Sequence, residues 1–127
     1  MDKRRQAQPL FHMWGTAKIL YSDANVTVKE LTFATLGKTS LHYHVRRYET
    51  LYIQSGTFSI RVYDSEKDVF EDVILKPGMT YTLARGCIHQ IKCTERGIII
   101  ETALTYEEED VVRIFNESIV RRGPSMR

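Results

Sequence analysis

The chain of 127 residues lacks both the long apolar runs of membrane proteins and the one-sided charge of nucleic-acid-binding proteins. No apolar run approaches the length that crosses a bilayer, and the N-terminus lacks the apolar core of a secretory signal. The 18 basic residues nearly balance the 16 acidic ones, which leaves a formal net charge of +2. We therefore expect a cytoplasmic protein that binds neither a membrane nor nucleic acid.

Cysteine is scarce as well, since the sequence contains only Cys87 and Cys93. If both lie on one strand they share a face, and that geometry does not suit a bridge between them. In a reducing compartment such thiols are more often small core residues than disulfide partners. Direct metal ligation by Cys87 is an alternative. A single domain of this length can bury its core without covalent cross-links.

Helical patterning is nearly absent, and internal repeats and low-complexity segments are lacking. Apolar alternation, β-branched and aromatic residues and frequent turn signals dominate from Ala24 to Thr102, which predicts an all-β protein. The predicted strands cover residues 26–33, 40–44, 49–54, 57–63, 69–75, 80–83, 88–93 and 97–101. A turn at Ser55-Gly56 joins the third to the fourth. A short helix is expected over Tyr106 to Asp110, capped by Thr105.

About eight strands without long helices predict a single-domain jelly roll or small barrel, whose interior can hold one metal ion and a small ligand. Histidine is rare in this chain, yet three of its four histidines fall into one pattern. His42 and His44 lie two apart on a predicted strand and share a face, the next strand returns Glu49 towards them, and His89 adds a fourth ligand.

Three imidazoles and one carboxylate suit Zn, Fe, Mn, Co or Ni and leave positions for water or substrate. We predict one divalent transition metal held by His42, His44, Glu49 and His89. The alternative is that the histidines are structural. His12 has no companion ligand and is interpreted as an ordinary surface residue.

The residues around these ligands resemble the two motifs of the cupin superfamily. The first motif is matched by Gly37, His42, His44, Glu49 and Gly56, with one residue fewer than usual between the first glycine and the first histidine. The second is matched by Gly78, Gly86 and His89, with Ala84 where proline is common and Cys93 where asparagine is common. The resemblance implies a cupin-type double-stranded β-helix, a jelly-roll barrel.

Over residues 13–115 the chain further resembles the cupin domain of bacterial type II mannose-6-phosphate isomerases and their short stand-alone relatives. The matching segments are Trp14-Gly15, Val28-Lys29, Ser40-Leu41, Arg47-Tyr48-Glu49, Ile100-Glu101 and Glu109-Asp110-Val111-Val112-Arg113. His42 stands where those isomerases typically have glutamine. The resemblance implies a cupin domain over 13–115, between a flexible N-terminal segment of residues 1–12 and a C-terminal tail of residues 116–127.

That family also implies a metal-assisted exchange between an aldose phosphate and a ketose phosphate. In such a reaction the metal polarises the carbonyl and hydroxyl of the sugar, and a base moves a carbon-bound proton. Glu49 and Glu101 are the candidate bases, although Glu101 is equally well explained as a support for the ligands or as part of a strand-end salt bridge.

Substrate contacts are predicted from residue type and position. Arg47 and Arg113 match the family pattern and offer planar donor forks for an anion. Tyr52 and Gln90 are expected to line the pocket, and core packing is the alternative for such residues. Together these groups favour a small hydroxylated anion, a sugar or sugar phosphate.

Two other functions use the same ligands. An iron-dependent dioxygenase could bind oxygen and substrate at such a centre, and a non-catalytic sugar-binding module could retain the barrel and its ion. Because the chain is too short for a lid, a homodimer is expected, in which Leu10, Phe11 and Trp14 cover a sheet edge of the partner. Alternatively these three residues plug the bottom of their own barrel.

Overall fold

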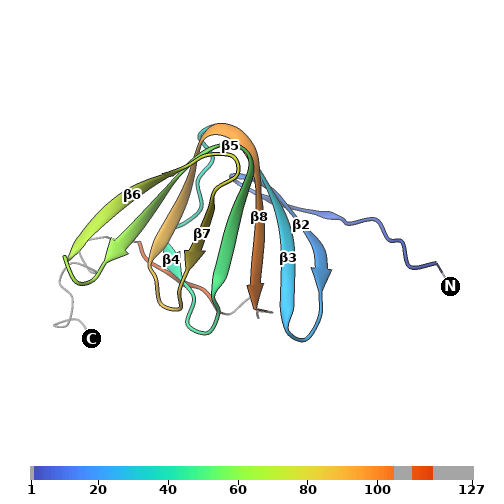
Figure 1. The fold of residues 1–127 in the computed structure, drawn as a ribbon, viewed down its shortest axis with the longest axis horizontal. Helices are drawn as coiled ribbons and strands as arrows, with labels where there is room; N and C mark the ends of the chain where they lie inside the picture. Colours follow the sequence, from blue (N-terminus) through green and yellow to red (C-terminus); the bar gives the residue numbers. More distant parts are fainter. Residues whose placement is uncertain (1, 105–109, 116–127) are drawn as a thin grey trace.

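The computed structural model describes residues 2–104 and 110–115 (Figure 1). Within these ranges nine strands form one antiparallel sheet, and no helix occurs there. The strands are β1 (Pro9–His12), β2 (Gly15–Ser22), β3 (Val26–Phe33), β4 (His42–Tyr43), β5 (Glu49–Asp64), β6 (Val69–Leu75), β7 (Thr80–Leu83), β8 (His89–Leu104) and β9 (Val112–Arg113). The all-β prediction is confirmed. The described part of the chain also contains no helix with the length and apolarity of a membrane span.

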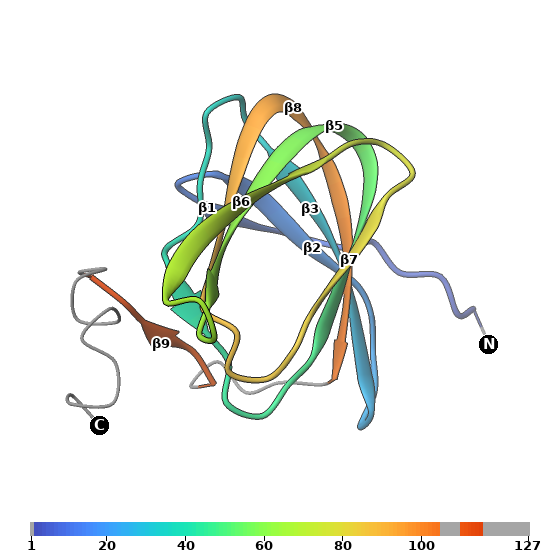
Figure 2. The ribbon, with the colours of Figure 1, turned by 60° about the vertical axis from the view of Figure 1, so that its left-hand side comes forward.

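The sheet curls into a partly open barrel, and the two long strands β5 and β8 form part of its wall (Figure 2). One path runs in the order β1-β2-β3-β8-β4-β9, while β5 pairs with β8, β6 and β7. Each long strand has 16 residues. Because both bend sharply halfway, their two ends belong to opposite walls of the barrel (Figure 1).

Two glycines permit this bend. The pairing of β5 with β8 shifts register between Ile53 and Phe58, where Gly56 has a φ of 80°. Gly97 sits opposite, so close to β5 that a Cβ atom there would lie 2.1 Å from the carbonyl oxygen of Ser55. The predicted turn at Ser55-Gly56 and the predicted break between residues 93 and 97 are therefore wrong, because bulges and glycines bend these strands without ending them.

Some of the other predicted strands are confirmed, and some are not. The predicted strands 26–33, 69–75 and 80–83 are confirmed by β3, β6 and β7, whereas β4 is shorter than the predicted strand 40–44. Strands β1, β2 and β9 were missed. Because β1 pairs with β2, residues 9–12 belong to the sheet. The predicted helix over 106–110, apart from Asp110, and the tail 116–127 lie outside the described residues.

The interior of the barrel has an apolar part and a polar part. Strict alternation on β3 turns Thr27, Lys29, Leu31 and Phe33 inward. Phe33 packs edge-on against Phe58, with ring centroids 5.2 Å apart, within a buried cluster. The polar part of the interior consists of buried charged and histidine side chains. These residues form the candidate site or lie next to it: Lys29, His44, Arg47, Glu49, His89 and Glu101.

Candidate metal centre

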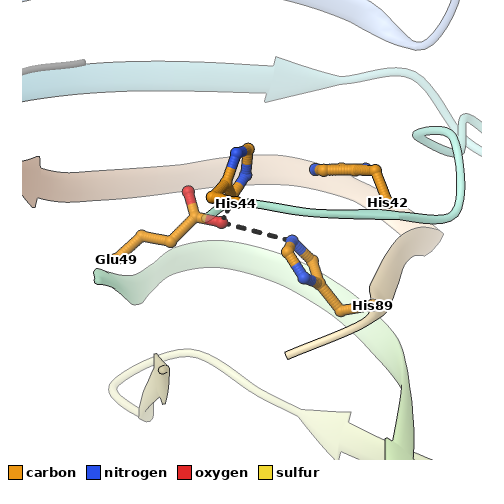
Figure 3. A group of neighbouring side chains, drawn as sticks. All are labelled: His42, His44, Glu49 and His89. Carbon is orange, nitrogen blue, oxygen red and sulfur yellow. Dashed lines mark ion pairs between the residues drawn. The ribbon is translucent and has the colours of Figure 1, made fainter. Parts of the chain in front are cut away.

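The four predicted metal ligands lie close together in the structure (Figure 3). His42 lies on β4 directly opposite His89, the first residue of β8. His44 follows β4, and Glu49 begins β5. One nitrogen of each histidine and one carboxylate oxygen of Glu49 all lie within 4.8 Å of one another. This group can hold a metal ion.

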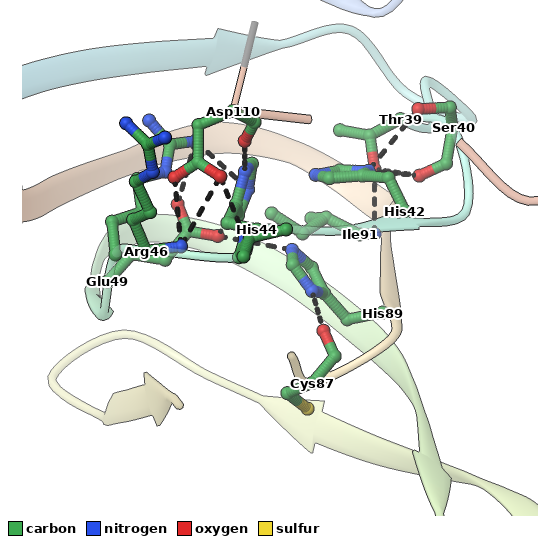
Figure 4. A network of polar contacts seen from close by, with 12 residues as sticks. Thr39, Ser40, His42, His44, Arg46, Glu49, Cys87, His89, Ile91 and Asp110 are labelled. Carbon is green, nitrogen blue, oxygen red and sulfur yellow. Dashed lines mark hydrogen bonds and ion pairs between the residues drawn. The ribbon is translucent and has the colours of Figure 1, made fainter. Parts of the chain in front are cut away.

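Backbone carbonyls determine which nitrogen each imidazole presents (Figure 4). The Nδ1 atoms lie 2.7 Å from the Ser40 oxygen for His42, 2.7 Å from the Asp110 oxygen for His44 and 2.8 Å from the Cys87 oxygen for His89. Because a carbonyl oxygen only accepts, each Nδ1 must carry the proton. In the neutral ring the lone pair then resides on Nε2, which is the arrangement common in metal-binding histidines.

The Nε2 atoms of two histidines converge on the carboxylate of Glu49. Glu49 Oε1 lies 3.1 Å from Nε2 of His44 and 3.2 Å from Nε2 of His89. Two lone-pair-bearing nitrogens beside a carboxylate oxygen are stable only with a proton or another cation among them. The donor set therefore fits a divalent cation.

The charge states of the ligands agree with that fit. Burial by itself would raise the pKa of Glu49, but its side-chain contacts, among them the hydrogen bond from Glu101, outweigh burial and hold the pKa well below the ordinary value. Burial, with the nearby His89, lowers the pKa of His42 to about 4. At neutral pH Glu49 is ionised and His42 is neutral, and these are the forms that bind metals.

Glu101 lies beside this group without belonging to it. Its side chain is 8% exposed and hydrogen-bonds to Glu49. Burial, followed by the negative charge of Glu49, raises the pKa of Glu101 to about 8. At neutral pH in this state Glu101 therefore carries a proton that it donates to Glu49.

A cavity of about 480 Å³ contains the four candidate ligands, and its wall also includes Glu101, Arg47, Arg113 and Lys29. Arg47 is buried, and its Nη2 lies 2.9 Å from His44 Nε2 and 3.5 Å from Glu49 Oε2. A guanidinium has no acceptor, so it donates to His44 Nε2. Arg113 enters the wall from β9, opposite His42.

Two predicted substrate contacts do not reach the cavity. Tyr52 is 43% exposed, because Glu49 and Leu51 take the inward positions of alternating β5 and leave Tyr52 outside. Gln90 follows the inward His89, and its Nε2 donates to the Thr39 carbonyl at 2.8 Å. Strand alternation explains why neither side chain lines this cavity, and their substrate-contact roles stay predictions.

The cavity wall also contains residues that were not predicted as site residues, among them Lys29 and His12. Lys29 is 9% exposed and lies opposite Glu101 across β3 and β8. Its inward phase on β3 was a usable signal, although lysines on strands usually face solvent. His12 is exposed, as its interpretation as a surface residue expected, yet it also lines the cavity and stacks on Trp14 with ring centroids 4.7 Å apart.

The cysteines do not form a disulfide. Cys93 is 2% exposed within the apolar cluster, as expected for a small core residue. Cys87 contributes its backbone carbonyl to His89, and its thiol is not part of the metal-capable group in the described residues. The structure therefore gives no support for ligation by the Cys87 thiol.

The chain therefore has the features of a β-barrel protein with a metal-capable centre: a curled antiparallel sheet, and a group of three histidines and one glutamate in its internal cavity. The sequence profile of the cupin family matches residues 12–119, and this chain belongs to the cupins. No curated protein matches it. The predicted cupin fold is confirmed.

Solved cupin structures are similar in fold at low sequence identity. An RmlC-like cupin from Shewanella frigidimarina shares 17% identity at a TM-score of 0.68, over 82% of this chain and 88% of that one. The capsular polysaccharide assembling protein CapF from Staphylococcus aureus shares 12% at 0.74, over 89% and 34%. Oxalate decarboxylase from Bacillus subtilis shares 15% at 0.73, over 85% and 30%. The chain thus spans about a third of the last two.

Proposed function

We propose that this cupin binds one divalent transition metal ion through His42, His44, Glu49 and His89 and interconverts an aldose and a ketose. The observation that carries the proposal is the position of Glu101. A second buried carboxyl lies in the same cavity and hydrogen-bonds to Glu49, yet stays outside the metal-capable group. An isomerase needs such a group, because a proton must leave one carbon and arrive at the next.

When bound, Zn, Fe, Mn, Co or Ni would polarise the carbonyl and adjacent hydroxyl of the sugar and acidify the hydrogen on the carbon between them. We assign the proton transfer between the carbons to Glu101, which must be in its carboxylate form to take the proton from one carbon and return it to its neighbour. The hydroxyl proton moves to the carbonyl oxygen in the same exchange. Glu49 takes this role only if it leaves the ligand set.

The cations of the cavity support an anionic, hydroxylated substrate. Arg47, Arg113 and Lys29 come from three different parts of the chain and all line the cavity. Guanidinium groups bind phosphate and carboxylate through paired hydrogen bonds. A volume of about 480 Å³ suits a small molecule. A sugar phosphate meets these requirements, and the resemblance to mannose-6-phosphate isomerases points in the same direction.

Deuterium exchange tests the proposed reaction directly. Metal-reconstituted protein is incubated in deuterated water with a panel of aldose and ketose phosphates, and NMR follows C1 and C2. The proposal expects deuterium at C1 or C2 of at least one sugar phosphate. Metal binding without exchange would reject the isomerase. Oxygen consumption by the iron-loaded protein would then identify a dioxygenase, and sugar binding without turnover a binding module.

A further inference from the structure

We propose that Asp110 is a positioning residue of the metal centre, which orients His44 and thereby sets the affinity for the metal. This inference rests on the metal-binding part of the proposed function and is independent of the isomerase reaction. Asp110 lies 66 residues after His44 in the chain. It is therefore a long-range support that the ligand spacing alone does not reveal.

Asp110 binds both the imidazole and the backbone that follows it (Figure 4). Its carbonyl accepts the Nδ1 hydrogen of His44 at 2.7 Å. Its carboxylate accepts from the amide of Val45 at 2.8 Å and from the amide of Arg46 at 3.2 and 3.3 Å. One residue thus fixes the ring of His44 and the direction in which the chain leaves it.

The loop between β4 and β5 depends on such side contacts because it lies outside the strands. On its other side, the Gly86 amide donates to the His44 carbonyl at 2.8 Å. The Arg85 Nε donates to the Arg46 carbonyl at 2.9 Å. The loop is therefore held from two sides, with Asp110 on one of them. Loss of the Asp110 carboxylate would release two amides and loosen the backbone that carries His44.

The segment 110–114 is anchored along this part of the barrel. Val112 and Arg113 pair with β4, and the Ile114 amide donates to the Leu41 carbonyl at 2.8 Å. Since Arg113 lines the cavity, the segment that orients His44 also supplies a cation to the ligand cavity. Asp110 is the point where this segment contacts His44.

The first test measures Zn²⁺ affinity by competition with a chromophoric chelator. Asp110→Ala should raise the Kd about tenfold or more, the usual effect of losing a residue that orients a ligand. Asp110→Asn should restore most of the affinity, because the amide oxygen still accepts from Val45. Asp64→Ala is the matched control, since Asp64 likewise accepts two backbone amides, at 3.0 and 3.2 Å, and does not line the cavity.

The second test measures the exchange of the His44 Nδ1 hydrogen in the absence of metal, by ¹⁵N–¹H NMR of the histidine side chains. The Nδ1 hydrogen of His44 should exchange faster in Asp110→Ala and remain protected in Asp110→Asn. The Nδ1 hydrogen of His89, bound to the Cys87 carbonyl, should not change in either variant. If Asp110→Ala does not fold, Asp110→Ser replaces it with the same expected direction in both tests.

The outcomes separate this inference from the proposed function. Unchanged Zn²⁺ affinity in Asp110→Ala, an unchanged His44 signal, or an equal loss of affinity in Asp64→Ala would overturn the role of Asp110. If the unmodified protein bound no metal even after reconstitution, metal binding itself would be refuted. The NMR comparison would then decide alone whether Asp110 orients His44.

Discussion

At the residue scale, the carbonyls of Ser40, Cys87 and Asp110 matter as much as the ligands that they orient. Each accepts an Nδ1 hydrogen and leaves Nε2 to face the cavity. A ligand that is already held in the required tautomer loses little freedom when a metal binds. This is why we regard the three histidines as a built site rather than as buried polar residues.

Glu101→Gln separates metal binding from catalysis. The amide keeps the size of the side chain but cannot carry a proton between carbons, so deuterium exchange should fall about a hundredfold or more, while metal content stays unchanged. Glu95→Gln is the control, because it makes the same substitution at an exposed position of β8. Exchange at the normal rate in Glu101→Gln would show that another group, with Glu49 as the first candidate, moves the proton.

The sequence predicted ligands better than pocket residues, and the reason is physical. His42, His44 and Glu49 are close in the chain, so strand alternation alone places them together. Tyr52 and Gln90 are near ligands in the chain, but neighbours on a strand point to opposite faces, and neither lines the cavity. Lys29 and Asp110 reach the site through pairing between distant segments, which spacing along the chain does not encode.

At the element scale, the shape of the barrel depends on how β5 and β8 bend past each other. Gly56 takes a positive φ in the bend, and Gly97 lies against the β5 backbone. The sequence contains these glycines, but it does not show that they bend the two long strands. Glycine is a frequent turn residue, so a bulge within one continuous strand and a turn between two strands look alike.

Gly97→Ala tests this arrangement. The Cβ of the alanine would lie 2.1 Å from the Ser55 carbonyl oxygen. Because that oxygen belongs to the backbone, the clash is relieved only if the strand itself shifts. We expect a loss of about 2–3 kcal/mol in the free energy of unfolding, measured by urea denaturation. Gly78→Ala is the control: with no atom within 4 Å of its Cβ, it should cost about 1 kcal/mol through its positive φ alone. Equal losses would contradict the close approach.

At the scale of the whole molecule, the barrel is apolar in one part and charged in the other. Phe33, Phe58 and Ile99 are almost fully buried in the apolar part, which supplies the packing energy. Buried charges around the cavity are costly unless they have partners. The fold therefore tolerates a demanding set of groups in one place, as expected where ligand binding rather than stability determines the residues.

The N-terminal edge of the sheet leads us to propose a homodimer. In the described residues β1 pairs only with β2, and it carries Leu10 and Phe11 at 52% and 81% exposure. Pairing of this edge with a second copy would cover both residues. Light scattering should therefore give the mass of a dimer, and Phe11→Asp should shift it to a monomer. Ile74→Asp, at an exposed position of β6, should not. A monomeric unmodified protein would refute the proposal.

The metal content of the purified and reconstituted protein, measured by mass spectrometry, tests the central claim most directly. We expect one divalent transition metal ion per chain, and loss of most of it in His44→Ala and in His89→Ala. His12→Ala, which alters the cavity wall outside the metal-capable group, should retain it. Full metal content in either ligand variant, or no metal in the unmodified protein, would contradict the account.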